Sequence, residues 1–339
     1  MIYRGTARNL ARMAKLLRAG EVVGVPTETV YGLAADALNA RACGKIFRAK
    51  GRPSSDPLIV HVLGWRDVEE IAETNEAAKG LAERFWPGPL TFVLRKKAAV
   101  PDVVTAGRPS VAVRAPSHPL LRKLLRLAGR PLAAPSANPF GYVSPTTAAH
   151  VQRGLGRRVR HILDGGPSRI GLESTIVDLR DPRRPRLLRP GRITREEIEG
   201  VLGVRLVRAA KVLGRGRAGR LAPGRFARHY SPHTPVVPHA RMSGKLAARS
   251  GEAEAWLFLA RPDAPRGRNI FWLDPRGDLR GAGRRLFSML RKLDEGGFRK
   301  IHVELVEGPG LAEAINDRIK RAGSRNTQSL AESRDARPS

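Results

Sequence analysis

The sequence predicts an α/β protein with two domains, a first one built on a mixed, strongly twisted sheet and a smaller three-layer one with an open sheet. Residues 6–205 alternate many short, apolar strand candidates with helical segments, which is the pattern of an α/β domain. A stretch rich in glycine, arginine and alanine follows, and a second alternation of strands and helices begins near residue 235. The length of 339 residues fits two domains.

The first domain opens with a helix and continues through short buried strands. Residues 7–20 have apolar side chains at helical spacing, and their final glycine is a stop signal. Residues 21–26 (EVVGVP) predict a short strand that ends at a proline. We expect further helices at 66–73 and 118–129, and further strands at 58–63, 90–96, 110–116, 131–138, 161–166, 174–179 and 186–190.

Composition also sets the predicted boundaries. We expect a first α/β domain at 1–205, a linker at 206–234, a C-terminal α/β domain at 235–325 and a disordered polar tail at 326–339. Residues 206–229 contain too much glycine and arginine for a core, which suits a mobile linker able to act as a lid. In the second domain we expect strands at 255–260, 269–274 and 300–306 and helices at 279–297 and 310–323.

The charge of the chain is strongly unbalanced. Lys and Arg number 62 against 31 Asp and Glu, a net charge of +31. This excess favours anionic partners, such as nucleic acid, nucleotides or an anionic surface, although a biased genome composition explains it equally well. The single cysteine, Cys43, excludes a disulfide framework and a cysteine-based zinc site. No apolar run is long enough to span a bilayer, so we expect a soluble, cytoplasmic protein without membrane contact.

A cationic segment precedes a buried strand candidate. In FRAKGRPSSDPLIVHV, Lys50 and Arg52 flank a glycine, and an extended backbone would point both side chains to one face, like a fork for phosphate oxygens. In so basic a chain such pairs also arise by chance. His61, inside the apolar run, is more often a core histidine than a functional one. Asp56 would be unfavourable near phosphates unless it faces Lys50, Arg52 or a metal.

Other polar residues stand at the ends of predicted strands. PTETVYGL (26–33) follows a buried strand, and polar groups at such a place bind ligands in many α/β folds, but it also suits a plain turn. Arg114 is the single charge of the strand in SVAVRAP, so it lies either at an exposed strand end or opposite an anion such as a carboxylate. APSANPFGYVSPT (134–146) offers hydroxyls and backbone N–H groups that can cradle phosphate, or simply form turns. Ser174 and Arg189 add polar groups at two further strand ends.

Individual fingerprints of known chemistry are missing. The chain has no phosphate-binding G-x-x-x-x-G-K-[ST] loop, no strand–G-x-G-x-x-G–helix unit, no H-E-x-x-H motif and no Ser–His–Asp signature. No single segment therefore decides the function.

The ordered set of motifs is more specific. PTETVYGL, the K-x-R pair before PLIVHV, WPGPLTFVL, VAVRAP, PLAAPSAN, DGG, ESTIVDL and LLRPG occur in this order within residues 6–205. Together they closely resemble the YrdC-like family of threonylcarbamoyl-AMP synthases. APGRFARHYSPHTP and GLAEAINDRIKRAG resemble the linker end and the closing helix of the family's long, two-domain version, although Arg225 stands where the linker usually has methionine.

The resemblance implies a reaction. L-Threonine, bicarbonate and ATP would give threonylcarbamoyl-AMP and pyrophosphate, with Mg²⁺ bound to the ATP phosphates and no metal held by the protein. Downstream tRNA threonylcarbamoyl transferase machinery would use the product to modify adenosine beside the anticodon, and the basic surface could contact tRNA. The carbamate attacks the α-phosphate, a step that needs positioning and charge neutralisation more than acid–base groups.

The resemblance also implies roles for individual residues. Lys50 and Arg52 would be the catalytic phosphate clamp, and Arg114 would pair with the carboxylate of threonine. The threonine-binding positions are Thr27, His61, Arg114 and Ser174. The ATP-binding positions are Lys50, Arg52, Ser54, Ser110, Ser136, Asn138, Ser144, Arg189 and Tyr230.

Two alternatives compete with this interpretation. A basic α/β module that binds double-stranded RNA or tRNA without chemistry fits the charge, but the motifs consist of small hydroxyls and single cations, which suit a small-ligand pocket. The related domain of hydrogenase-maturation carbamoyltransferases accompanies cysteine-pair zinc motifs, and a chain with one cysteine cannot supply these.

Overall fold

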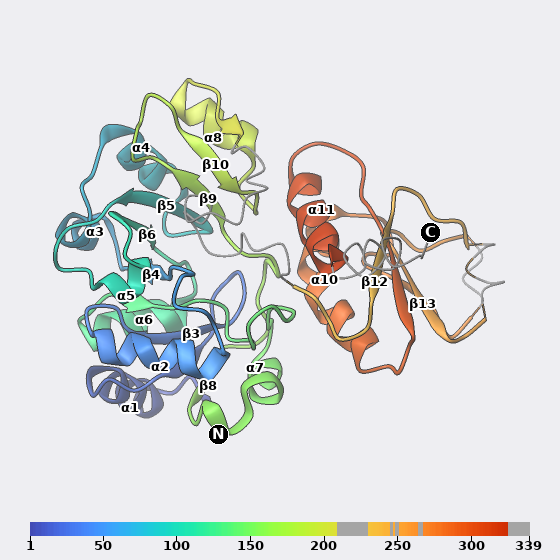
Figure 1. Ribbon diagram of the computed structural model, residues 1–339, viewed down its shortest axis with the longest axis horizontal. Helices are drawn as coiled ribbons and strands as arrows, with labels where there is room; N and C mark the ends of the chain where they lie inside the picture. Colours follow the sequence, from blue (N-terminus) through green and yellow to red (C-terminus); the bar gives the residue numbers. More distant parts are fainter. Residues whose placement is uncertain (209–229, 245–246, 248–250, 264–266, 325–339) are drawn as a thin grey trace, which may run out of the picture. The chain divides into compact units, whose positions relative to one another are not determined.

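The computed structural model describes residues 1–208, 230–244, 247, 251–263 and 267–324 (Figure 1). Contacts divide the chain into two compact units. The first comprises Met1–Phe140 and Ser144–Arg225, and the second comprises Gly141–Val143 and Phe226–Ser339. Most of the expected linker (209–229, including Arg225) and the expected tail lie outside the described residues.

The first unit is built on one large mixed sheet. Its described strands follow the order β1-β8-β2-β3-β7-β4-β6-β5-β9-β10-β11. Pairs such as β4–β6 and β5–β9 are parallel, whereas β5–β6 and β9–β10 are antiparallel. The mixed sheet of the prediction is therefore confirmed. The strands are β1 (Ile2–Arg4), β2 (Val23–Val25), β3 (Gly32–Asp36), β4 (Ile59–His61), β5 (Leu90–Arg95), β6 (Ser110–Arg114), β7 (Leu132–Ala133), β8 (Ile162–Asp164), β9 (Thr175–Asp178), β10 (Arg186–Arg189) and β11 (Val207–Arg208).

Helices cover this sheet and begin and end where the local sequence dictates. Thr6 caps the first helix, its side chain accepting from the N–H of Asn9, and Gly20 follows the helix with φ +77°. The apolar stripe of this helix packs with that of α6 in one core cluster, which contains Leu17 and Leu121. The helices are α1 (Ala7–Arg18), α2 (Ala40–Lys50), α3 (Trp65–Ile71), α4 (Glu76–Phe85), α5 (Asp102–Thr105), α6 (Pro119–Ala128), α7 (Ala148–Leu155) and α8 (Arg195–Leu202), with a 3-10 turn at Gly156–Arg158.

Strand β3 was not expected from the sequence. Its residues, GLAAD, include no β-branched or aromatic side chain, so its local strand preference is low. All five are nevertheless buried, and the strand pairs antiparallel with β2 and β7 on its two sides. Pairing with β2 and β7 therefore forms this strand, and residues 26–31 of the motif PTETVYGL lie immediately before it in the interior of the sheet.

The second unit contains an all-parallel sheet in the order β12-β15-β13-β14. Its strands are β12 (Val236–His239), β13 (Glu254–Phe258), β14 (Ile270–Trp272) and β15 (Lys300–Glu304), and its helices are α10 (Leu279–Asp294) and α11 (Leu311–Ala322). Asp278 caps α10, and α11 contacts both α10 and β12. The expected open α/β sheet is confirmed for this unit.

Candidate functional site

Arg114 is buried at the end of β6 and forms the centre of the candidate site. It is 3 % exposed and donates from Nη2 to Glu28 Oε1 (2.5 Å), from Nη1 to Thr29 Oγ1 (3.0 Å) and from Nε to the carbonyl of Gly88 (3.1 Å). The second expectation for this arginine, that it faces a carboxylate, is confirmed. A guanidinium has five N–H donors, so these three bonds leave two for a ligand.

Glu28 is a site residue that the sequence analysis missed. Its Oε1 also accepts the N–H of Ser117 (3.1 Å), while Oε2 is buried without a hydrogen-bond partner among the described residues. Burial opposes ionisation, but the charge and hydrogen bond of Arg114 hold the pKa of Glu28 below its usual value. The signal was present in the sequence, because an arginine inside an apolar strand needs an acidic partner and Glu28 lies within PTETVYGL.

Thr27 shapes the turn that presents Glu28. Its Oγ1 donates to the carbonyl of Val30 (2.6 Å) and accepts the N–H groups of Thr29 (3.0 Å) and Val30 (3.2 Å). Thr27 Oγ1 also lies 2.8 Å from Thr29 Oγ1. The expected position Thr27 therefore lies beside Arg114, and its hydroxyl fixes the loop that supplies the partners of that arginine.

His61 lies next to Arg114, because the two residues are register partners in β4 and β6. Burial, and then the positive charge of Arg114, lower the pKa of His61 from 6.5 to about 3. Its imidazole is neutral at physiological pH.

The lowered pKa of His61 predicts an acid-sensitive stability. The unfolded chain binds a proton at this residue near pH 6.5 and the folded chain only near pH 3, so stability is full above about 6.5 and falls as the pH drops towards 3. The loss is up to about 1.4 kcal/mol per pH unit. In His61→Asn, urea unfolding at several pH values between 7 and about 4 should show a shallower decline than in the wild type. Parallel curves for the two proteins would contradict this assignment.

Ser174 joins two further expected residues. It immediately precedes β9, and its Oγ lies 2.7 Å from Thr91 Oγ1 on β5, the strand between β6 and β9. Arg189 donates from Nη2 to Ser174 Oγ (3.1 Å) and from Nε to the carbonyl of Ser174 (3.0 Å). Ser144 Oγ donates to Oε1 of Glu173 (2.5 Å), the residue that precedes Ser174 in the chain. The structure thus brings Ser144, Ser174 and Arg189 together.

Lys50 joins the expected loop residues Ser136 and Asn138. Its Nζ donates to the carbonyl oxygens of Ser136 (2.5 Å) and Asn138 (2.6 Å), and the side chain is buried. Burial, and then the charge of Arg52, lower the pKa of Lys50 well below its usual value. The extended backbone considered for the fork is wrong, because Lys50 ends α2 and Gly51 caps it with φ +62°. Two of the three ammonium donors are used, which leaves one.

Arg52 is held by the loop that follows it. Its guanidinium forms an ion pair with Asp56 (2.8 Å) and donates to the carbonyl oxygens of Asp56 (3.2 Å) and Pro57 (2.7 Å). Asp56 therefore faces Arg52. This is one of the arrangements that the sequence analysis named as making an acidic residue acceptable near phosphates. The pair fixes the guanidinium of Arg52, which lies two residues beyond the end of α2.

Three expected ATP positions lie apart from these clusters. Ser110 is buried at the first residue of β6, at the opposite end of that strand from Arg114. Ser54 is exposed in the loop after α2. Tyr230 belongs to the second unit, where it is fully buried with φ +62°, its ring 5.3 Å from that of Phe287 and 5.5 Å from the guanidinium of Arg318.

The described residues contain no group of three or more His, Cys, Asp or Glu side chains that could hold a metal ion. Among the same residues, no helix combines the length and apolar character needed to cross a membrane.

Comparison with known proteins adds independent information. Residues 15–191 match the Sua5/YciO/YrdC family model, described as "Telomere recombination", and residues 193–324 match "Threonylcarbamoyl-AMP synthase, C-terminal domain". The threonylcarbamoyl-AMP synthase of Pyrococcus abyssi is 42 % identical over 91 % of this chain and 92 % of its own length. That of Bacillus subtilis is 40 % identical over 93 % of each chain. The crystal structure of P. abyssi Sua5 complexed with L-threonine superposes with a TM-score of 0.86 at 39 % identity, covering 95 % of this chain and 97 % of that one.

Proposed function

Since the chain belongs to the threonylcarbamoyl-AMP synthase family, we propose how its residues carry out the reaction of that family. The protein is an enzyme of the nucleotidyltransferase type that forms threonylcarbamoyl-AMP for tRNA modification, with ATP and L-threonine as substrates. We take bicarbonate as the source of the carbamoyl carbon. The ammonium group of threonine first loses a proton to solvent, the free amine attacks that carbon, and water leaves. A carbamate oxygen then attacks the α-phosphorus of ATP and displaces pyrophosphate.

We assign the threonine subsite to the surroundings of Arg114. The two N–H donors of Arg114 that remain would bind the threonine carboxylate side by side, and bidentate geometry favours arginine over lysine here. His61, Thr27 and Ser174 complete the subsite. The observation that carries this assignment is the buried guanidinium, held on three sides with two donors unused.

Glu28 would recognise the ammonium group of threonine. In an α-amino acid the ammonium and carboxylate groups are attached to the same carbon, so a ligand bound through Arg114 brings its ammonium close to the ion-paired carboxylate of Glu28. Glu28 Oε2 is buried without a partner among the described residues, a state that costs free energy which an ammonium N–H would recover.

Glu28→Gln therefore should weaken binding of L-threonine by about tenfold or more, since hydrogen bonds to charged groups are worth about 1.5–3 kcal/mol. It should leave the affinity for 3-hydroxybutyrate, which is threonine without its amine, unchanged. Calorimetric titration of wild type and variant with both ligands tests this. Equal weakening of both ligands would mean that Glu28 acts only by holding Arg114.

We assign the ATP side to Lys50 and Arg52 as the phosphate clamp, with Ser136, Asn138, Ser144 and Arg189 as further contacts. Ser54, Ser110 and Tyr230, which lie apart from these residues, stay predictions from the resemblance. The support is the rigid placement of both cations, Lys50 by two carbonyl groups and Arg52 by Asp56. Mg²⁺ would enter on the ATP phosphates and neutralise part of their charge.

We also propose a role for each segment of the chain. We place catalysis in residues 1–205, a linker with a lid role in 206–234, an auxiliary domain in 235–325 and a disordered tail in 326–339. We further propose that the enzyme works in the cytoplasm, passes its product to the tRNA threonylcarbamoyl transferase machinery, and contacts tRNA through its basic surface. The net charge of +31 supports the last point.

Incubation with labelled bicarbonate, L-threonine and ATP tests the function directly. We expect a labelled adenylate together with one pyrophosphate for each carbamoyl group captured. ATP cleavage that does not depend on threonine, without a labelled product, would contradict it.

A further inference from the structure

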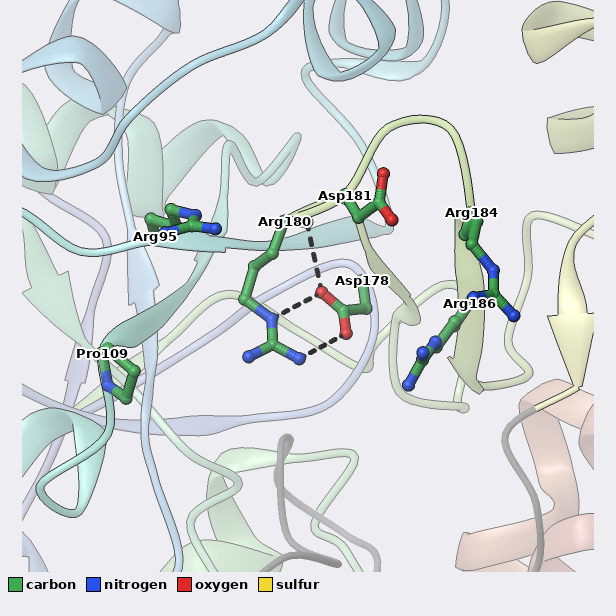
Figure 2. Close-up of a pocket in the computed structure, with 7 residues that line it drawn as sticks. All are labelled: Arg95, Pro109, Asp178, Arg180, Asp181, Arg184 and Arg186. Carbon is green, nitrogen blue, oxygen red and sulfur yellow. Dashed lines mark hydrogen bonds and ion pairs between the residues drawn. The ribbon is translucent and has the colours of Figure 1, made fainter.

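A pocket of about 320 Å³ opens in the first unit at one end of β5, β6, β9 and β10 (Figure 2). We call it the distal arginine pocket. Its charged lining consists of Arg95, Asp178, Arg180, Asp181, Arg184 and Arg186. None of these residues belongs to the threonine or ATP positions assigned above.

The pocket lies at the opposite end of these strands from the threonine subsite. Asp178 ends β9, whereas Ser174 immediately precedes its first residue, and Arg186 begins β10, whereas Arg189 ends it. At about 3.3 Å per residue, a four-residue strand separates the two ends by roughly 10 Å. A ligand in the distal arginine pocket would therefore leave Ser174 and Arg189 free.

One arginine of the pocket is firmly anchored. Arg180 donates from Nε and Nη2 to the two carboxylate oxygens of Asp178 (2.8 Å each), and its backbone N–H donates to Asp178 Oδ1 (3.2 Å). Asp178 is 5 % exposed. The paired guanidinium has fixed geometry, and its Nη1 donors remain available.

The other three arginines have no such partner. No described residue forms a side-chain hydrogen bond or an ion pair with Arg95, Arg184 or Arg186. The lining thus holds four guanidinium groups and two carboxylates, and one of these carboxylates is already used by Arg180. The four guanidinium groups outnumber the two carboxylates, and a bound anion would relieve the repulsion that remains among them.

We propose that the distal arginine pocket is a docking site for the phosphate backbone of RNA. Guanidinium groups match phosphate oxygens in geometry as well as in charge. Arg95 lies on one side of the Arg180–Asp178 pair, and Arg184 and Arg186 lie on the other (Figure 2). This spread favours successive phosphates of a chain over one small anion wrapped at a single point. The choice of RNA rests on the proposed function, since the product of the enzyme is used on tRNA.

The test is binding of a fluorescent short RNA duplex to the full-length protein, followed by anisotropy between about 50 and 200 mM salt. The variant is Arg184→Ala/Arg186→Ala. The matched control is Arg8→Ala/Arg126→Ala, which removes the same charge from two exposed arginines on α1 and α6. We expect the pocket variant to bind RNA about tenfold or more weakly and to lower the salt slope by about two, because each arginine removed would have neutralised one phosphate. The control should bind nearly as wild type does.

Equal weakening in both double variants would show that RNA binding follows net charge alone and would overturn the proposal. Unchanged RNA binding in the pocket variant would also overturn the proposal. So would a pocket variant that loses binding of pyrophosphate but binds RNA as well as wild type does. Synthesis of threonylcarbamoyl-AMP should be unchanged in both variants. A wild-type protein without synthase activity but with pocket-dependent RNA binding would refute the proposed function and leave the docking site standing.

Discussion

Lys50→Gln should lower the rate of threonylcarbamoyl-AMP formation by about 10²–10³-fold, the usual cost of removing one group that stabilises charge in a transition state. Glutamine can still donate from its amide to a carbonyl such as that of Ser136 or Asn138, so the loop stays held while the positive charge is lost. Alanine is a poorer test, because two buried carbonyl groups would lose their donor at about 1–3 kcal/mol each. Pyrophosphate release measures the rate, and calorimetry measures the melting temperature.

The matched control for Lys50 is Lys45→Gln on the same helix. Lys45 forms an ion pair with Glu21 (2.8 Å) in which both side chains are partly exposed, and such pairs contribute about 0–1 kcal/mol. We expect its activity to equal that of wild type. A Lys50→Gln enzyme with wild-type turnover and a normal melting temperature would end the assignment of Lys50 to the phosphate clamp.

Arg114→Lys should raise the KM for L-threonine and lower kcat/KM by about 10²–10⁴-fold, because two charge-assisted hydrogen bonds to the carboxylate are lost at about 1.5–3 kcal/mol each. Lysine keeps a positive charge opposite Glu28, so the buried carboxylate retains an ion-pair partner. Arg114→Ala would remove that charge and destabilise the fold by about 3–5 kcal/mol, the cost of breaking a buried ion pair. Steady-state kinetics with threonine and ATP varied separately provide the measurement, and we expect the KM for ATP to change little.

Arg122→Lys is the matched control for this substitution. Arg122 donates from Nη1 to the carbonyl oxygens of Leu63 (3.0 Å) and Pro116 (3.3 Å) and has no role in the proposed site. Its kinetics should match those of wild type. If the control and Arg114→Lys lose activity to the same degree, the effect comes from packing near α6 and the carboxylate assignment is wrong.

Features that depend on local sequence were predictable. The extents of α1 and α6 follow from an apolar stripe together with Thr6 before one helix and Gly129 after the other. The family and its activity were also accessible, because eight ordered motifs lie in one chain and the comparisons confirm the resemblance. Such motifs are short and continuous in the sequence, so a linear pattern records them.

Features that depend on pairing between distant segments needed the tertiary structure. Strand β3 has weak local preference and exists because β2 and β7 pair on either side of it. Lys50 and Arg52 looked like a fork, but Gly51 ends the helix between them and directs them to different partners.

In the candidate site, too, the sequence determined some features and the tertiary structure determined others. By itself the sequence determined that Arg114 needs an anion or an exposed position, since burying a lone guanidinium is too costly. Only the tertiary structure decided that Glu28, 86 residues earlier, is that anion, and that the pair leaves two donors and one carboxylate oxygen unused among the described residues. The distal arginine pocket likewise joins Arg95 to Arg186 through the neighbouring strands β5, β9 and β10, and charge counting along the chain cannot reveal which cations share one pocket. Hydrogen bonds and charges act over a few ångströms of space, and folding alone brings residues so far apart in the chain within that range.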